Sequence, residues 1–117
     1  MRKDNPELVD MINTLKLKAR ENKARIWRDI AERLEAPSSN YAEVNLSKIE
    51  RHANDGDIIV VPGKVLGSGV LSKKVTVAAW KFSQKADEKI KNAGGRTLSI
   101  LELIDENPKG SNVRIMR

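Results

Sequence analysis

The chain has 117 residues, with 22 lysines and arginines against 16 acids, a net charge of +6 and no cysteine. This length suits one compact domain, and the missing cysteine excludes disulfides, thiolate metal sites and cysteine nucleophiles. The basic excess favours a polyanionic partner, with nucleic acid ahead of an anionic membrane and ordinary solubility charge as the alternative.

The first 36 residues predict two helices. Asp4 or Asn5 followed by Pro6 is a helix start, because proline is tolerated where the first amide has no partner. A polar break at residues 21–23 separates this helix from a second one, which must end before Pro37. The apolar residues at helical spacing are Leu8, Ile12, Leu15 and Ala19, then Ile26, Trp27, Ile30, Ala31 and Leu34. Residues 1–36 are therefore expected to form an N-terminal helical extension.

Residues 37–117 predict an α/β core within the same structural domain. In chain order we expect a helix at 45–53, a buried strand at 58–61, and a strand at 75–80. A helix capped by Ser83, a short strand at 96–98, a helix after Ser99 and an edge strand at 113–115 follow. Pro62-Gly63 is expected to end the first of these strands. Residues 64–74 then read as an exposed basic loop, mobile without a partner because its glycines make ordering costly.

An interval from Ile58 to Ala86 contains no aspartate or glutamate, yet it carries five lysines. Buried strands explain the missing acids in part, but they do not explain the lysines. A glycine-containing loop without acids brings backbone amides close to phosphates, which the lysines neutralise. We therefore predict phosphate contact here, ahead of an ordinary solvated loop. The lysines are Lys64, Lys73 and Lys74 in the loop, with Lys81 and Lys85 beyond it.

A second basic group lies in the N-terminal helices, where residues 1–28 carry eight basic and four acidic residues. A solvated helix face explains such spaced charges about as well as RNA contact does. The candidates for RNA contact are Lys16, Lys18, Arg20, Lys23, Arg25 and Arg28. Among the aromatics, Trp27 and Trp80 are expected in the core, and Tyr41 is the one most free to reach RNA.

The sequence contains no complete catalytic or cofactor-binding motif. Gly67-Ser68-Gly69 begins like a dinucleotide fingerprint, but Ser72 stands where the third glycine belongs. Gly63-Lys64 lacks the upstream glycine and the following hydroxyl of a Walker A motif. His52 is the only histidine and has no neighbouring metal-ligand cluster in the sequence. We therefore expect no enzyme, no cofactor, no metal and no small-molecule substrate.

Several blocks of the sequence, in order, resemble the archaeal large-subunit ribosomal protein family "eighteen-e", which is related to bacterial large-subunit protein fifteen. The resemblance covers nearly the whole chain from Asn5 onward. The blocks that carry it are residues 42–51, 60–69, 75–79, 82–83, 89–90, 93–95 and 107–114.

The resemblance implies an irregular superhelix of strand-strand-helix turns and a structural role in the large ribosomal subunit, without catalysis. It implies that the glycine-basic loop lies against large-subunit rRNA, and that the helix expected at residues 45–53, before the loop, could face the same RNA. The residues concerned are Gly63, Lys64, Gly67, Ser68 and Gly69 in the loop, and Asn45, Lys48 and Arg51 in the helix. Neighbouring large-subunit proteins are further expected partners. The sequence contains no long apolar run, so we expect a cytoplasmic protein with no membrane partner.

The sequence leaves two other classes of protein open. A free tRNA- or DNA-binding protein would share the basic surface but would act away from ribosomes. A protein-interaction module would use the N-terminal helix pair as its docking face, and its complex would survive RNase.

Overall fold

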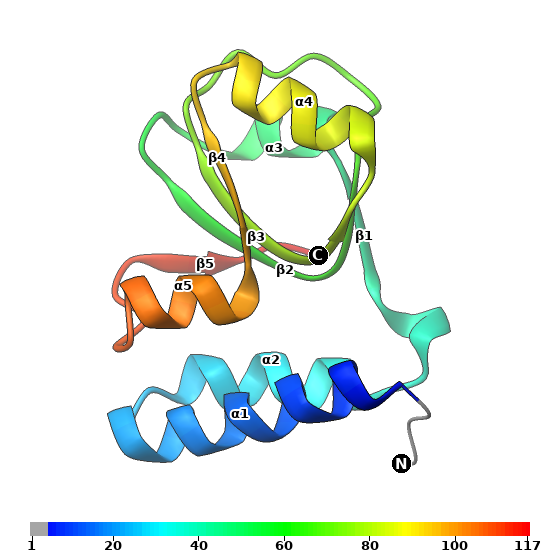
Figure 1. Cartoon of the computed structure of the whole chain (residues 1–117). Coiled ribbons are helices and arrows are strands. Elements are labelled where there is room, and N and C mark those ends of the chain that lie inside the picture. Colours follow the sequence, from blue (N-terminus) through cyan, green and yellow to red (C-terminus); the bar gives the residue numbers. More distant parts are fainter. Residues whose placement is uncertain (1–4) are drawn as a thin grey trace. The chain divides into compact units, whose positions relative to one another are not determined.

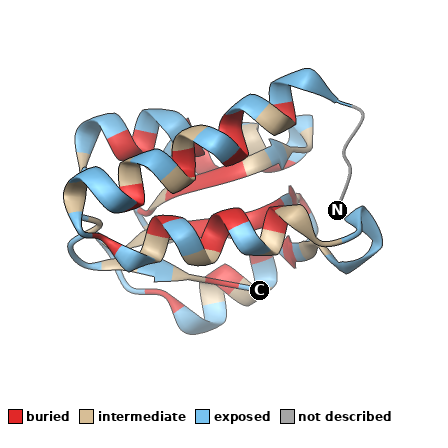
Figure 2. Ribbon diagram, turned by 90° about the horizontal axis from the view of Figure 1, so that it is seen from below, coloured by how far each residue is buried: buried red, intermediate tan, exposed pale blue. Residues whose placement is uncertain are grey.

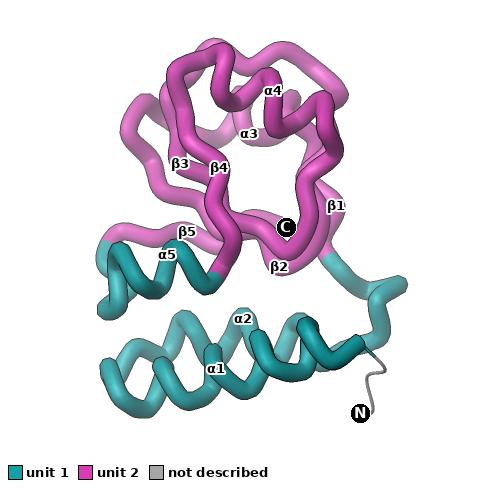
Figure 3. Tube along the Cα trace, viewed as in Figure 1, with its two compact units in different colours: residues 1–41, 101–111 teal, residues 42–100, 112–117 magenta. Residues whose placement is uncertain are grey.

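The α/β class expected from the sequence is confirmed by the computed structural model, which describes residues 5–117. The chain divides into two compact units (Figure 3). The helical unit comprises the residues up to Tyr41 together with Leu101–Ser111, and the sheet unit comprises Ala42–Ile100 and Asn112–Arg117. The domain boundary expected after residue 36 stays a prediction.

The helical unit is built on α1 (Pro6–Asn22) and α2 (Arg25–Glu35), which pack side by side (Figure 1). The side chain of Asn5 caps α1 by accepting hydrogen bonds from the amides of Glu7 and Leu8, at 2.9 and 3.3 Å. Lys23, in the left-handed conformation at φ 51°, forms the turn between the two helices. The predicted apolar residues of both helices are buried, with the exception of half-buried Ile26, and Figure 2 shows buried positions recurring along the helices.

Residues 101–111 join this unit through Trp27. Its ring is fully buried, and its Nε1 donates a hydrogen bond of 2.7 Å to the carbonyl of Pro108. This segment contains most of α5 (Ile100–Glu106). A short 3-10 turn (η1, Ser38–Asn40) follows α2, and the Tyr41 hydroxyl donates to the carbonyl of Leu34 at 2.5 Å. Trp27 therefore lies in the core as predicted, whereas Trp80, expected there too, is only half-buried. The Tyr41 hydroxyl is hydrogen-bonded within the helical unit.

The sheet unit contains five parallel strands. They are β1 (Ala42–Asn45), β2 (Ile58–Leu66), β3 (Thr76–Phe82), β4 (Arg96–Ser99) and β5 (Val113–Ile115). The order is β1-β2-β3-β4, and β5 pairs with β2. Two strands share one edge of β2, because β5 pairs with residues 58–60 and β1 pairs with residues 63–66. The short strand expected at the C-terminal end is thus an edge strand, as predicted.

Two helices pack on one face of this sheet. They are α3 (Leu46–His52) and α4 (Gln84–Asn92), whose buried side chains join those of β2 and β3 in one cluster. Ser83 caps α4 as predicted, since its hydroxyl accepts a hydrogen bond of 3.1 Å from the Ala86 amide. The chain order β2, β3, α4 agrees with the strand-strand-helix order that the resemblance implied.

One expectation about β2 is wrong: Pro62 and Gly63 do not end the strand, which continues to Leu66. The pairing of β2 with β3 is irregular between Val61 and Lys64, and a bulge of this kind is where a strand tolerates a proline. Gly63 lies against β1, where a Cβ would stand 2.0 Å from the carbonyl oxygen of Ala42. The prediction failed because β1, which supplies this close approach, was itself not predicted.

Candidate RNA-binding surface

The loop between β2 and β3 begins at Gly67, so Gly63 and Lys64 belong to the strand and not to the loop as predicted. Its first residues lie between the starts of α3 and α4. The Ser47 amide at the start of α3 donates to the carbonyl of Ser68 at 3.1 Å. The ammonium of Lys89, on α4, donates to the carbonyls of Gly67 at 2.9 Å and Gly69 at 2.8 Å.

Close packing explains both glycines of this segment. A Cβ at Gly67 would stand 2.7 Å from the Cβ of Lys85, and one at Gly69 would stand 2.7 Å from the backbone nitrogen of Ser47. Gly69 also has φ +101°, a conformation that side chains disfavour. The glycines therefore let the loop touch both helices, and Ser68 remains exposed between them.

The second half of the loop is tied to α3 and to the turn after it. The carboxylate of Glu50 accepts hydrogen bonds from the amide and the hydroxyl of Ser72, at 3.1 and 2.7 Å. These bonds, the hydroxyl's first, lower the pKa of Glu50 below its ordinary value, with a smaller contribution from Lys73. The ammonium of Lys73 donates to the carbonyls of Glu50 and Ala53, and the Lys74 amide donates to Asp55 at 2.8 Å.

These contacts change the expectation of a mobile loop. Charged groups of Lys89 and Glu50 satisfy backbone groups of the loop, and the ammonium of Lys73, a loop residue, bonds backbone carbonyls at the end of α3. Hydrogen bonds to charged groups are the stronger kind. We therefore expect the loop to be ordered in the isolated protein. The ammonium groups of Lys73 and Lys89 are occupied by these bonds.

Other lysines of the acid-free interval present free ammonium groups. Lys64, Lys74 and Lys85 are exposed, and their side chains form no hydrogen bond or ion pair with residues 5–117. Lys64 stands opposite Lys81 on β3, whose ammonium lies 4.7 Å from the centre of the Trp80 ring. Glu43 of β1 stands opposite Lys64 on the other side, but no ion pair joins them. The pairing of β1, β2 and β3 thus places one acid and two lysines in a row.

The residues predicted on α3 are only partly available. Asn45 precedes the helix, is exposed, and makes no side-chain capping bond. Arg51 is exposed and has no partner among residues 5–117, whereas the ammonium of Lys48 donates to the carbonyl of Arg117. Arg114 is also held, by the carbonyl of His52 at 3.0 Å and the carboxylate of Asp57 at 3.5 Å. Asn45 lies beside the loop, since Ser47 contacts Ser68 and Gly69.

The basic residues of the helical unit separate into paired and unpaired groups. Lys16 contacts Glu35 at 2.8 Å, Lys18 contacts Glu21 at 3.4 Å, and Arg28 contacts Glu32 at 3.7 Å. The side chains without a partner in residues 5–117 are Arg20, Lys23 and Arg25, which surround the turn between α1 and α2. Lys109 reaches the same turn by donating to the Asn22 carbonyl at 3.2 Å. Half of the predicted group is therefore a salt-bridged helix face.

Sequence reasoning left several contributors out of the predicted site. Lys81 and Lys85 were recognised only as members of the acid-free interval. Because β1 was not predicted, the row of Glu43, Lys64 and Lys81 across the sheet could not be predicted either. Lys89 gave no sequence signal, because its carbonyl partners lie 22 and 20 residues away. Within residues 5–117, no group of acids and histidine could hold a metal ion, and no helix has the length and apolar character of a membrane span.

A family model described as ribosomal protein 60S L18 and 50S L18e matches residues 1–117. The chain belongs to this ribosomal protein family. It is 57% identical over 115 residues to the large ribosomal subunit protein eL18 of Methanoregula boonei, covering 98% of this chain and 95% of the relative. The eL18 protein of Archaeoglobus fulgidus is 53% identical over 116 residues, covering 99% of each chain.

Membership of the L18 and L18e family makes the chain a structural protein of the large ribosomal subunit rather than an enzyme. The family assignment made from the sequence blocks is confirmed, together with its archaeal character. The alternatives of a free nucleic-acid binder and of a protein-interaction module lose their support.

Proposed function

We propose that this L18e-family chain binds large-subunit rRNA through two basic surfaces. The loop surface consists of Lys64, Lys81 and Lys85 with Asn45, Ser68 and Lys74, in the sheet unit. The helix-turn surface consists of Arg20, Lys23 and Arg25, in the helical unit. The observation that carries the proposal is that the lysines of this surface, all within the acid-free interval of the chain, form no ion pair with residues 5–117.

The physical basis is counterion release with shape fit. A lysine that has no internal partner can neutralise a phosphate without first breaking an ion pair. The backbone of the loop is held in place by Lys89 and Glu50, so little ordering cost remains to be met on binding. Structured RNA is read mainly through its shape and its 2′-hydroxyl groups, so phosphate contacts are expected to dominate.

The predicted site residues fall into groups according to whether their charged or polar groups already have a partner inside the protein. We assign direct phosphate contact to the unpaired cations of the two surfaces and also to Arg51 on α3, which lies outside both. Gly63, Gly67 and Gly69 contribute by packing, and the ammonium groups of Lys73 and Lys48 hold backbone carbonyls. Lys16, Lys18 and Arg28 are placed outside the contact set, because their acids would have to be displaced first.

The test is the salt dependence of binding to transcribed large-subunit rRNA of the source organism. Replacing Lys64 by methionine is expected to reduce the slope of log affinity against log salt by about 0.7 to 0.9, the value for one phosphate contact. Lys73→Met is the matched control, because its ammonium points to carbonyls, and the slope should stay at the wild-type value. Equal slopes for wild type and Lys64→Met would contradict the loop surface.

We further propose that the chain is cytoplasmic within assembled subunits and that neighbouring large-subunit proteins contact it. Sedimentation of cell extract through a sucrose gradient tests this: the chain should migrate with large subunits and leave them after RNase treatment. Recovery near the top of the gradient would contradict it. The kinship with bacterial large-subunit protein fifteen stays a prediction from the resemblance.

A further inference from the structure

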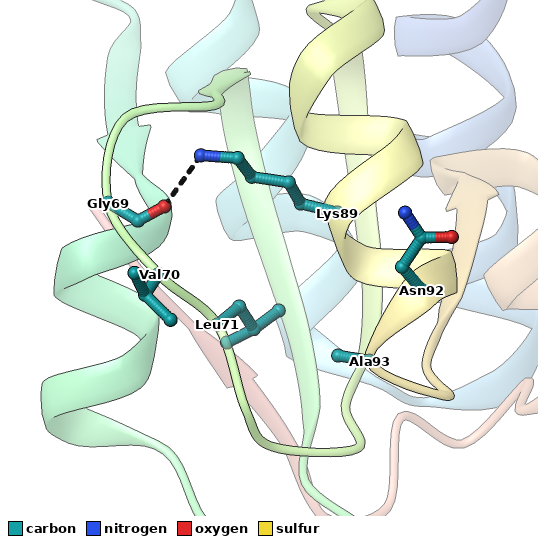
Figure 4. A pocket seen from close by; sticks show the side chains of 6 residues that line it. All are labelled: Gly69, Val70, Leu71, Lys89, Asn92 and Ala93. Atoms are coloured by element: carbon teal, nitrogen blue, oxygen red, sulfur yellow. Dashed lines mark hydrogen bonds between the residues drawn. The ribbon is translucent and has the colours of Figure 1, made fainter.

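A pocket of about 230 Å³ lies between the loop and α4. Figure 4 shows its two walls, with Gly69, Val70 and Leu71 from the loop opposite Lys89, Asn92 and Ala93 from α4 and its end. An apolar cavity of about 150 Å³ is enough to bind benzene. This pocket is open to solvent, and its volume is sufficient for one planar ring system the size of a nucleobase.

The lining of the pocket is apolar with one free polar group. Val70 is 76% exposed although it is apolar, Leu71 is buried, and Ala93 is half-buried. The ammonium of Lys89 is occupied by two carbonyls of the loop. The side chain of Asn92 is exposed and forms no hydrogen bond with residues 5–117. The pocket therefore offers apolar walls and one amide that can both donate and accept.

Free cations stand on two sides of this pocket. Lys85 precedes Lys89 by one helical turn on α4. The Lys74 side chain lies beside Gly94, with its Cε 3.0 Å from where a Cβ would stand, next to the lining residue Ala93. Both acids of α4 accept hydrogen bonds within the protein. Asp87 accepts from Lys91 and Thr97, and Glu88 accepts from Gln84. A nucleotide in a strand carries a phosphate on each side of its base, which matches this arrangement.

We propose that the pocket binds one unstacked nucleobase of the rRNA, with adjoining phosphates at Lys85 and Lys74 and the base edge read by Asn92. This inference rests on the proposed function. Proteins read RNA sequence mainly at unstacked bases in loops and bulges. An asparagine amide can donate to N1 and accept from N6 of an unpaired adenine, on the edge that base pairing otherwise uses, so adenine is the expected base.

The experiment uses the full chain at saturating concentration on transcribed large-subunit rRNA, probed with dimethyl sulfate, which methylates unpaired adenines. One unpaired adenine should be protected by the wild-type chain. It should become reactive again with Ala93→Leu, which fills the pocket, and with Asn92→Ala. Asn92→Ala should also weaken binding roughly fivefold or more, as expected for a lost base-edge pair.

Matched controls lie in the helical unit. Asn40→Ala removes an exposed asparagine whose side chain has no hydrogen bond with residues 5–117, and Ser39→Leu adds a leucine at an exposed position. Both controls should leave the protected adenine protected. Far-ultraviolet circular dichroism and the unfolding midpoint of each variant show that the fold is intact.

The outcomes distinguish the pocket from the proposed function. Unchanged adenine protection with Ala93→Leu and Asn92→Ala, at full rRNA binding, overturns the pocket and leaves the proposed function standing. The nucleobase proposal is also overturned if subunits reconstituted with Ala93→Leu or Asn92→Ala lose a neighbouring ribosomal protein while the adenine stays protected. That result would assign the pocket to a side chain of the neighbouring protein. Failure of the wild-type chain to bind the rRNA removes the proposed function itself.

Discussion

The ammonium of Lys89 lies 2.8 Å from the carbonyl oxygen of Gly69, and the same group reaches the carbonyl of Gly67 at 2.9 Å. One side chain of α4 therefore holds two carbonyl groups of the loop backbone. Its charge is directed into the protein, so its expected effect on RNA binding differs from that of a lysine on the surface.

Lys89→Met should loosen the loop without removing a phosphate contact. Each lost hydrogen bond is expected to cost about 1 kcal/mol, and more where the donor is charged. Amide exchange at residues 67–71 should accelerate, and rRNA affinity should fall while the salt slope stays at the wild-type value. Lys91→Met is the matched control, since it removes an equal charge from exposed α4 surface. A slope change with Lys89→Met equal to that of Lys64→Met would instead make Lys89 a phosphate contact.

Gly69→Ala and Gly56→Ala form a pair that isolates packing from backbone conformation. Both glycines have positive φ, at +101° and +88°, but only Gly69 has atoms where a Cβ would stand. Gly56→Ala should cost about 1 kcal/mol of unfolding free energy from conformation alone. Gly69→Ala should cost at least about 1 kcal/mol more, since Ser47 must move. Urea denaturation measures both values. Equal losses would mean that the contact with α3 does not restrain the loop.

The tie between Glu50 and Ser72 should depend on pH. Because the pKa of Glu50 is lowered by the Ser72 bonds, the tie stabilises the fold above the ordinary pKa of 4.5. Its contribution is lost as the pH falls through the lowered value in the folded protein. A pH titration of the Glu50 carboxyl-carbon signal by nuclear magnetic resonance should give a midpoint below 4.5, and Ser72→Ala should raise that midpoint. A midpoint at the ordinary value in both proteins would contradict the tie.

The helix-turn surface predicts unequal effects for two sets of three basic residues. Replacing Arg20, Lys23 and Arg25 together by glutamine should weaken rRNA binding and reduce the salt slope by up to about 2 to 3. The same replacement of Lys16, Lys18 and Arg28 should change the slope less, because each is already paired with an acid. Filter binding at several salt concentrations measures both. A larger slope change for the paired set would reverse the assignment.

Local patterns were sufficient for much of the fold. Helical spacing identified α1 and α2, Asn5 and Ser83 marked helix starts, and β-branched runs marked the buried strands. These features depend on a few consecutive residues, so they can be read without knowing what packs against them. The strand β1 was missed because its apolar and polar residues alternate over only four positions beside a polar loop, too short a run to stand out as a strand, and it is the pairing with β2 that fixes these residues as one.

The loop site was predicted as an interval of the chain. In the folded protein its lysines separate into those bonded to backbone carbonyls and those without a hydrogen-bond or ion-pair partner in residues 5–117. The sequence by itself determined that a basic, acid-free segment exists between two buried strands, since charge and hydrophobicity are local properties. It also determined the family, because ordered blocks of residues carry that information.

Only the tertiary structure decided which cations are free. Lys73 and Lys89 are lysines like Lys64 and Lys85, but folding brings backbone carbonyls to the first two and none to the others. The glycines, expected to bring the backbone close to phosphates, instead allow contact with β1, α3 and α4. The partners of these lysines and glycines are distant from them in the chain. The type of a residue does not indicate which distant residues will lie beside it after folding.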